Sequence, residues 1–211
     1  MVFVFFFLSL FTSLSLSDEA GQNQQSNFTN LVSDKVRGRD YEILVADRDH
    51  PITIFAIHGG RIEPGTCKLA LDLSQGIFNS YLFRGLIPGD TWGALHLTSS
   101  RYDEEKALEL AEKSSICVSI HSYPSNTPEL CLGGGNQGLS QKLASLLSQN
   151  PDFRVHAPCE KFPGTNSNNI VNRCQGKGIQ IEISSGLMRH LDSDSTARQM
   201  FLSQIRDGIS Y

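Results

Sequence analysis

Three common signatures are missing from this 211-residue sequence, and each absence excludes a class of protein. No G-x-S-x-G motif occurs, which argues against a serine hydrolase of the α/β-hydrolase type. No two of the five cysteines have C-x-x-C spacing, which argues against a cysteine zinc ribbon. A basic surplus is also missing, because the formal net charge is -4, and we therefore expect no nucleic-acid partner.

A hydrophobic run long enough to span a bilayer comfortably is missing from the N-terminus as well. The uncharged stretch 1–17 ends in Ser15-Leu16-Ser17, with small residues at the positions that signal peptidases read. We predict a signal peptide at 1–17, a secreted protein, and no stable membrane association after cleavage. Because the usual basic start is missing, a retained membrane anchor is the alternative.

The five cysteines suit an oxidising compartment, where some of them should pair. Cys159 and Cys174 flank a polar loop and are the predicted pair, and the odd number leaves at least one free thiol or an intermolecular bond. The polar segment 18–39 is predicted to be a flexible lead. The remainder, 40–211, has the length of one domain without internal repeats, and we expect a monomer.

Short β-branched apolar runs alternate with helical periodicity over the rest of the chain. Strands are predicted at 52–57, 81–83, 95–98, 116–120, 129–132 and 179–183. Helices are predicted from 64 toward 78 and at 103–112, 136–148 and 194–209. This alternation is typical of an α/β sandwich with a mainly parallel or mixed sheet.

A histidine emerges where the first of these strands ends. His58 is followed by two glycines, which let the backbone turn sharply, and Glu63 comes just before a predicted helix. Ligands of open α/β sheets gather beyond the carboxyl ends of the strands, so the two side chains can supply one nitrogen and one oxygen ligand. The alternative is a plain strand-to-helix turn with a carboxylate at the helix start.

The buried strand 116–120 also ends in a histidine, His121. Two strands of one sheet that each end in histidine can place both imidazoles over the same edge. His58, Glu63 and His121 together make the His-His-Glu set of many catalytic zinc sites, which leaves a fourth position for water. We therefore predict a Zn2+ cofactor, with structural histidines as the alternative.

Glu182 lies near the carboxyl end of the strongly apolar strand 179–183. An unpaired carboxylate is costly to bury there, so it needs a metal, an arginine or a catalytic reason. A carboxylate beside a zinc-bound water can take its proton and pass it to a leaving nitrogen, and we predict this general-base role for Glu182. A salt bridge to Arg189 or Arg173 is the alternative.

Five further residues are candidates for contact with substrate: Arg61, His96, Asn172, Arg173 and Arg189. Arginine forks pair with carboxylates, so the arginines and the Asn-Arg pair suit an anionic polyglutamate or peptide substrate, although each is otherwise an ordinary surface residue. His96 is interpreted either as a group that stabilises the oxyanion or holds substrate, or as a hydrogen-bonded core histidine.

The segment 133–138 formally satisfies the dinucleotide pattern G-x-G-x-x-G. It lies late in the chain and lacks a persuasive acidic partner about 20 residues further on. We therefore interpret it as a tight turn or a backbone wall of the site.

Six blocks of the sequence resemble, in order and without large gaps, the phage-type poly-γ-glutamate hydrolases, and the resemblance runs from about Asp40 to the C-terminus. The blocks are 56–66 (AIHGGRIEPGT), 95–99 (LHLTS), 118–122 (VSIHS), 133–136 (GGGN), 169–173 (NIVNR) and 178–184 (GIQIEIS).

This resemblance implies a three-layer α/β/α fold with a mixed, largely parallel sheet, similar to zinc carboxypeptidases. It also implies cleavage of γ-glutamyl amide bonds in poly-γ-glutamate or a similar polymer. The matching zinc ligands are His58, Glu63 and His121, and the matching catalytic carboxylate is Glu182. Two alternatives remain: a zinc peptidase or cell-wall amidase of the same fold, and a non-catalytic secreted binding protein.

Overall fold

The computed structural model describes residues 26–210. The predicted signal peptide, 1–17, lies outside this range. The strands are β1 Tyr41–Ala46, β2 Ile52–Gly60, β3 Asn79–Gly85, β4 Ile116–Tyr123, β5 Glu129–Gly133, β6 Arg154–His156 and β7 Gly178–Ser184. The helices are α1 Phe28–Val32, α2 Thr66–Ser74, α3 Thr91–Leu95, α4 Glu105–Lys113, α5 Gln137–Leu147, α6 Ser185–Ser193 and α7 Ser195–Ile209, with two 3-10 helices, η1 Ser99–Arg101 and η2 Ile170–Arg173.

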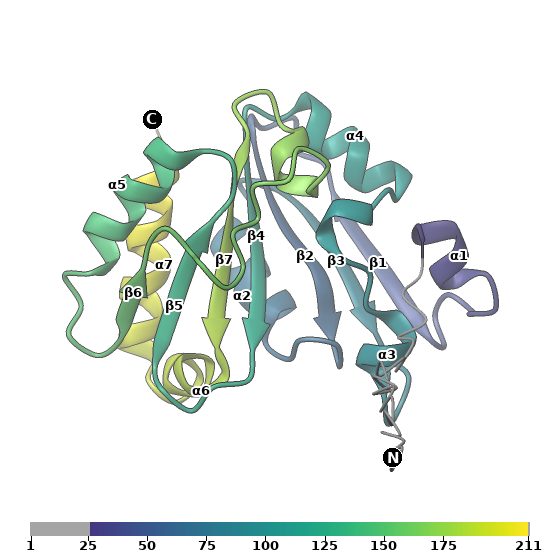
Figure 1. Ribbon diagram of the computed structural model, residues 1–211, viewed down its shortest axis with the longest axis horizontal. Helices are drawn as coiled ribbons and strands as arrows, with labels where there is room; N and C mark the ends of the chain where they lie inside the picture. The colour runs from purple at the N-terminus through teal and green to yellow at the C-terminus, as the bar shows by residue number, and fades with distance from the viewer. Residues whose placement is uncertain (1–25, 211) are drawn as a thin grey trace, which may run out of the picture.

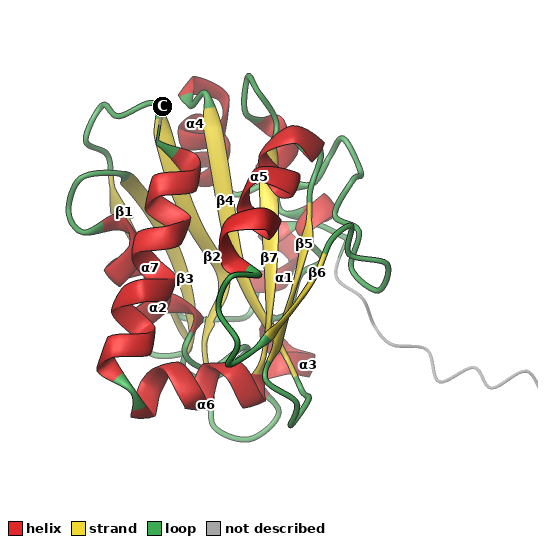
Figure 2. Ribbon diagram, turned by 90° about the vertical axis from the view of Figure 1, so that its left-hand side faces the viewer, coloured by secondary structure: helices red, strands yellow, loops and turns green. Residues whose placement is uncertain are grey.

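The seven described strands form one mixed sheet in the order β1-β3-β2-β4-β7-β5-β6. The central strands β3, β2, β4 and β7 are mutually parallel, and β1 at one edge runs antiparallel to β3. Near the other edge, β5 runs antiparallel to β7 and parallel to β6. Helices cover both faces of the sheet (Figures 1 and 2). The predicted three-layer α/β/α sandwich with a largely parallel sheet is therefore confirmed.

Successive side chains along a central strand point to opposite faces of the sheet and belong to two separate hydrophobic cores. On β2, Ile54 and Ala56 belong to the core under α2, α5, α6 and α7, whereas Phe55 and Ile57 belong to the core under α1, α3 and α4. Strands that are buried on both faces read as continuous apolar runs, which is why the sequence revealed them. The arrowheads of β2, β4 and β7 point to one end of the sheet, flanked by α3 and α6 (Figure 1).

Part of the segment predicted as a flexible lead, 18–39, is folded. Asn27 caps α1 by accepting a hydrogen bond from the Asn30 N–H at 2.8 Å. Phe28 packs edge-on against Phe83 and Tyr102 at 5.6 Å each, which anchors the helix on the aromatic side of the core. Polar composition predicted a flexible segment, but burial of the apolar side chains of Phe28 and Leu31 holds α1 on the core.

The predicted strand at 95–98 is wrong. Asp90 accepts a hydrogen bond from the Gly93 N–H at 2.8 Å and caps α3, so that Leu95 ends a short helix and His96 follows in an extended conformation. The predicted helix from 64 begins instead at Thr66, because Gly65 holds a left-handed conformation with φ of 92°. The helices predicted at 136–148 and 194–209 are confirmed as α5 and α7, whereas α6 and the edge strands β1 and β6 were not predicted.

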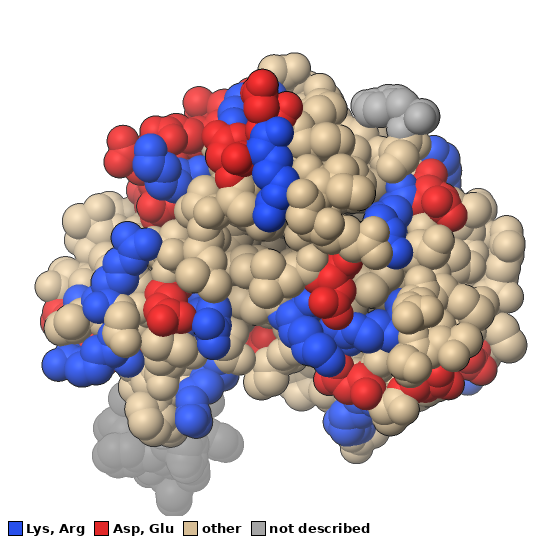
Figure 3. All heavy atoms as spheres, turned by 180° about the vertical axis from the view of Figure 1, so that it is seen from behind, with Lys and Arg blue, Asp and Glu red and all other residues tan. Residues whose placement is uncertain are grey.

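Charged side chains of both signs lie next to one another on the α2 and α7 face (Figure 3). Arg198 of α7 is buried and donates to Asp72 of α2 at 2.7 Å and to Asp192 of α6 at 3.0 Å. This ion-pair network ties three helices of one layer together. No helix among residues 26–210 is long and apolar enough to cross a membrane.

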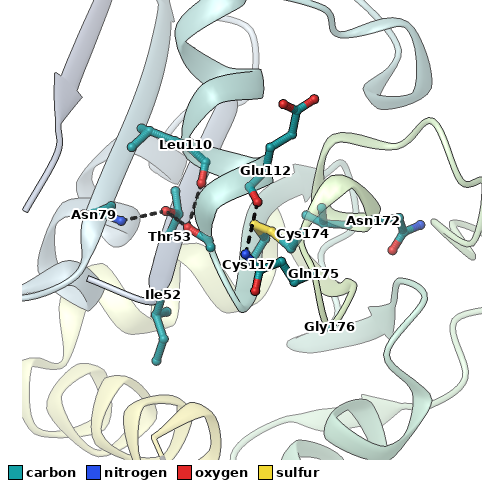
Figure 4. Close-up of a disulfide and its surroundings, with 12 residues drawn as sticks. Ile52, Thr53, Asn79, Leu110, Glu112, Cys117, Asn172, Cys174, Gln175 and Gly176 are labelled. Carbon is teal, nitrogen blue, oxygen red and sulfur yellow. Dashed lines mark hydrogen bonds between the residues drawn. A yellow bond between two sulfur atoms is a disulfide. The ribbon is translucent and has the colours of Figure 1, made fainter. Parts of the chain in front are cut away.

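The predicted disulfide between Cys159 and Cys174 is wrong, because each cysteine pairs with a strand residue instead. Cys174, which follows η2, pairs with Cys117 at the start of β4 (Figure 4), and Cys159 pairs with Cys131 of β5. The Cα–Cα separations are 6.0 and 5.0 Å, within the usual range for disulfides. Cys67 is the remaining free cysteine.

Candidate metal centre and catalytic cleft

Three strand ends meet at the carboxyl edge of the sheet. β2 contributes His58, β4 contributes His121, and β7 contributes Glu182. His121 and Glu182 are paired neighbours in the parallel ladder of β4 and β7, so their side chains leave the same face of the sheet. All three side chains are buried, with residue exposures of 2%, 2% and 6%.

The turn after β2 brings Glu63 back toward His58. The register of β2 against β3 shifts between Ala56 and Gly59, a bulge of the kind that redirects a strand-end side chain. Gly60 has φ of 70°, and a Cβ there would lie 2.3 Å from the Gly85 carbonyl oxygen, so glycine is required. The Glu63 N–H then donates to the His58 carbonyl at 2.7 Å, which closes the turn.

The ligand atoms of His58, Glu63 and His121 converge on one point. His58 Nδ1 lies 2.8 Å from Glu63 Oε1 and 3.1 Å from His121 Nδ1, and His121 Nδ1 lies 3.3 Å from Glu63 Oε2. A tetrahedral ion with bonds of about 2.1 Å separates its ligands by roughly 3.4 Å. Two Nδ1 atoms and a carboxylate at these separations therefore fit a zinc ion.

Each of the three candidate ligands is held in place by a further hydrogen bond. His58 Nε2 lies 2.8 Å from the Leu97 carbonyl oxygen, and His121 Nε2 lies 2.8 Å from Ser119 Oγ. The Ser122 N–H donates to Glu63 Oε2 at 2.9 Å. A histidine whose Nε2–H is engaged in this way presents an unprotonated Nδ1 to a metal.

The electrostatics of the three ligands are strongly coupled. Burial raises the pKa of Glu63, but the two histidines outweigh burial and hold that pKa well below its usual range. Burial lowers the pKa of His121, but the Glu63 carboxylate outweighs it and raises the pKa to about 8. The three residues therefore form a buried carboxylate between two imidazoles, an arrangement suited to a cation.

Glu182 lies at the end of a buried hydrogen-bonded chain that sequence reasoning missed. Gln180 Nε2 donates to Glu182 Oε1 at 2.8 Å, and Asn169 Nδ2 donates to Gln180 Oε1 at 2.8 Å. Burial, the largest influence, raises the pKa of Glu182. The polar residues 180 and 182, two positions apart in an apolar strand, are the sequence signal that could have identified Gln180.

A cavity of about 970 Å³ opens over these groups. Its lining includes the three ligands and Glu182, together with His96, Arg189 and apolar side chains from several loops. The His96 ring stacks on Trp92 with centroids 4.3 Å apart, and it contacts His58 in a tilted arrangement with centroids 4.2 Å apart. Burial lowers the pKa of His96 to about 3, so the ring is neutral and able to donate or accept a hydrogen bond.

The structure does not bring all the candidate substrate residues to this cavity. Of the arginines, Arg189 lines it, whereas Arg61 and Arg173 are exposed residues outside its lining. Asn172 serves the backbone instead: it accepts from the Gly135 N–H and donates to the Gly164 carbonyl, each at 2.8 Å. Asn172 lies near the Cys117 disulfide, at the amino end of β4 (Figure 4).

The glycine-rich segment 133–138 is a turn and helix cap, as interpreted from the sequence. A Cβ on Gly134 would lie 2.3 Å from the Gly178 carbonyl oxygen, and Asn136 caps α5 by accepting from the Leu139 N–H. Close backbone packing explains these glycines without a nucleotide.

Comparison with known proteins agrees with this architecture. The sequence profile of the poly-gamma-glutamate hydrolase family matches residues 25–205. The chain belongs to this family. The resemblance seen in the six sequence blocks is thereby confirmed.

One relative is the SPbeta prophage-derived UPF0714 protein YoqZ of Bacillus subtilis (strain 168), which is 37% identical to this chain over 187 residues. That alignment covers 87% of this chain and 66% of the relative, just under two thirds of its length.

Two solved structures share the fold. A bacteriophage poly-gamma-glutamate hydrolase superposes with a TM-score of 0.79 at 29% identity, covering 87% of this chain and 95% of the other. YndL, described as an apo, zinc-free form, superposes with a TM-score of 0.74 at 31% identity, covering 79% and 82%.

Proposed function

We propose that this protein is a secreted, zinc-dependent hydrolase that cleaves γ-glutamyl amide bonds of poly-γ-glutamate or a similar polymer. The observation that carries the proposal is the convergence of His58, Glu63 and His121 within 3.3 Å of one another beside a buried Glu182. Family membership supports the bond type, and the relative described as zinc-free supports the metal. The two disulfides support an oxidising compartment.

His58, Glu63 and His121 would hold the zinc through two Nδ1 atoms and one carboxylate. When bound, zinc supplies Lewis acidity, which lowers the pKa of a water toward ~7 and polarises a carbonyl. Leu97, Ser119 and Ser122 keep the ligands oriented, as described above. A neutral pair of histidines with one carboxylate is a donor set that zinc prefers.

Glu182 moves the proton in this scheme. It accepts one proton from the attacking water, whose oxygen bonds to the amide carbon, and delivers that proton to the leaving nitrogen as the C–N bond breaks. The raised pKa of Glu182 suits a group that must hold this proton between the two steps. The hydrogen bond from Gln180 leaves one carboxylate oxygen for the transfer.

Two other lining residues face the substrate. Arg189 carries the positive charge that can pair with a substrate carboxylate. The neutral imidazole of His96 can donate a hydrogen bond to the developing oxyanion. The remaining proposed substrate contacts, Arg61, Asn172 and Arg173, have no part in this scheme because they lie outside the cavity lining.

The test combines metal analysis with a Glu182→Gln variant and a matched Glu112→Gln control on the exposed surface of α4. Purified wild type should contain one zinc per chain and hydrolyse poly-γ-glutamate in preference to α-linked polyglutamate. Glu182→Gln should keep the zinc and lose at least ~100-fold in kcat, while Glu112→Gln keeps wild-type activity. Full activity in Glu182→Gln, or activity unaffected by chelators, would refute the mechanism. Preference for α-linked or cell-wall peptides would assign a peptidase or amidase instead.

A further inference from the structure

A second cavity, of about 730 Å³, adjoins the cavity that holds the candidate metal ligands. The two cavities share three lining residues, Tyr123, Pro124 and Phe162, so they meet along this boundary. The proposed function uses the first cavity alone. A polymeric substrate extends beyond the bond that is cleaved, and its further units need a place to bind outside that cavity.

The register of the sheet places the second cavity in line with the candidate site. Glu182 of β7 pairs with His121 of β4 on one side and with Cys131 of β5 on the other. Cys131 in turn pairs with His156 of β6. Directly paired residues point to the same face of a sheet, so these four side chains form a row across four neighbouring strands. The row begins in the first cavity, at His121 and Glu182, and ends in the second, at Cys131 and His156.

The loop that follows β6 crosses β5 on this face of the sheet (Figure 1) and is anchored at two points. The Cys159 N–H donates to the Leu132 carbonyl at 2.9 Å, and a disulfide also ties Cys159 to β5. The Gly134 N–H donates to the Pro163 carbonyl at 2.9 Å. Lys161 lies between these anchors, so the backbone that carries it is fixed before a ligand binds.

The Lys161 side chain lines the second cavity and reaches the boundary with the first. Its ammonium lies over the rings of Tyr123 and Phe162, 5.2 and 5.0 Å from their centroids, and both rings line both cavities. Ring faces attract a cation but do not neutralise it. No carboxylate among residues 26–210 forms an ion pair with this ammonium, so its charge is available to an anionic ligand.

Two carboxylates also line the second cavity, and neither is a partner of Lys161. Glu129 is already engaged, because one of its oxygens accepts from Ser125 Oγ at 3.1 Å and the other lies 3.3 Å from His156 Nε2. Glu160 is exposed to solvent, where water and salt screen its charge. The Lys161 charge is therefore not cancelled within the cavity.

Arg189 is the corresponding group of the first cavity. Its guanidinium donates to the neutral Asn126 Oδ1 at 3.0 Å and forms no ion pair within the described part of the chain. The two adjoining cavities thus present one positive group each. A γ-glutamyl polymer leaves one free carboxylate on every unit, and such a ligand can pair with positive groups at successive positions.

We propose that the second cavity is a subsite for a γ-glutamyl unit beyond those joined by the scissile bond, and that Lys161 binds the free carboxylate of that unit. The inference rests on the proposed function for the type of bond. It adds where the polymer continues past the metal site and which residue makes the enzyme select long chains over short ones.

Two substrates test the inference: γ-glutamylglutamate, which has no unit beyond the scissile bond, and a γ-linked glutamate hexamer. Lys161→Gln should lower kcat/KM for the hexamer about fivefold, the upper end of what an exposed ion pair contributes, and should change the value for the dimer less than about twofold. The variant is compared with wild type on each substrate separately, which cancels the larger number of cleavable bonds in the hexamer. Lys161→Arg, which keeps the charge, should retain most of the activity on the hexamer.

The matched control is Lys142→Gln, which removes an exposed lysine of α5 outside both cavity linings and should change neither value. Added salt should weaken the wild-type preference for the hexamer more than that of Lys161→Gln, because salt screens an exposed pair. An unchanged kcat/KM of Lys161→Gln on the hexamer would overturn the inference. An equal loss on both substrates would also overturn it, because Lys161 would then act at the cleaved bond or on the fold.

Both of these outcomes leave the proposed function intact, which fails instead if the zinc-loaded wild type cleaves no γ-glutamyl compound. Binding gives a second readout that needs no turnover. In the Glu182→Gln background, adding Lys161→Gln should raise the Kd of the hexamer about fivefold and leave that of the dimer within about twofold. An unchanged Kd for the hexamer would refute the subsite whether or not the protein is a hydrolase.

Discussion

Removal of one hydroxyl behind the metal centre should weaken zinc binding. Ser119 Oγ lies 2.8 Å from His121 Nε2, and both residues are buried, at 0% and 2% exposure. Ser119→Ala leaves the imidazole N–H without this acceptor and frees the ring to rotate. Loss of such a partner typically costs about 10–100-fold in metal affinity, which corresponds to about 1.4–2.7 kcal/mol. The cost of about 1–3 kcal/mol for an unsatisfied buried donor agrees with this range.

The assay is competition with a chromogenic zinc chelator at one fixed neutral pH, with urea unfolding of the metal-free protein measured in parallel. Ser114→Ala is the matched control, because Ser114 is also fully buried and its hydroxyl bonds Leu110 and Thr53, which Figure 4 labels, at 2.7 Å each. Ser114 precedes the start of β4, whereas His121 lies near the other end of that strand. Both variants should lose stability, but only Ser119→Ala should lose zinc affinity. Zinc affinity of Ser119→Ala within twofold of wild type would refute the reasoning that His121 binds through Nδ1 with Nε2 held by Ser119.

Three other predictions concern the metal, a disulfide and a turn. Zinc affinity should fall about tenfold for each pH unit below 8, because a proton then competes with the metal for His121. Burial lowers the pKa of His121, but Glu63 raises it more, to about 8. A zinc affinity that does not change between pH 6 and 8 would contradict this prediction. Replacing Cys131 and Cys159 together by serine should lower the free energy of unfolding by roughly 3–4 kcal/mol, which is the loss of chain entropy expected for a loop closed over 28 residues. An unchanged midpoint of urea unfolding would contradict this prediction. Gly60→Ala should destabilise the protein by more than about 1 kcal/mol and lower the zinc content, because the φ of 70° at Gly60 and the adjacent Gly85 carbonyl exclude a Cβ. A folded variant with wild-type zinc content and melting temperature would contradict this prediction.

Much of the site was predictable because its residues stand at the ends of recognisable strands. The apolar runs before His58 and His121 predict parallel strands, and parallel neighbours bring their carboxyl ends to one edge. Glu182 was predictable for a related reason, since a carboxylate in an apolar strand requires a partner. These inferences need only periodicity and residue type within short windows.

The substrate contacts were less predictable. Asn172 and Arg173 are adjacent and have suitable chemistry, yet Asn172 is used to hold backbone groups of two other loops. Trp92 was not predicted as a site residue because a lone tryptophan has no periodic signal, and its place in the cavity lining depends on α3, a short helix that was not predicted. The correct role of each residue depends on partners that lie dozens of positions away in the chain.

The sequence by itself determined the layered α/β architecture, the edge of the sheet that carries the chemistry, and the candidate ligands His58, Glu63 and His121, because these follow from local hydrophobic patterning and strand ends. Only the tertiary structure decided which cysteines pair, that Gln180 and Asn169 hold Glu182, and that one arginine rather than three reaches the cavity. Those outcomes depend on distances between segments remote in sequence, which the packing of helices and loops on the sheet sets and no local pattern encodes.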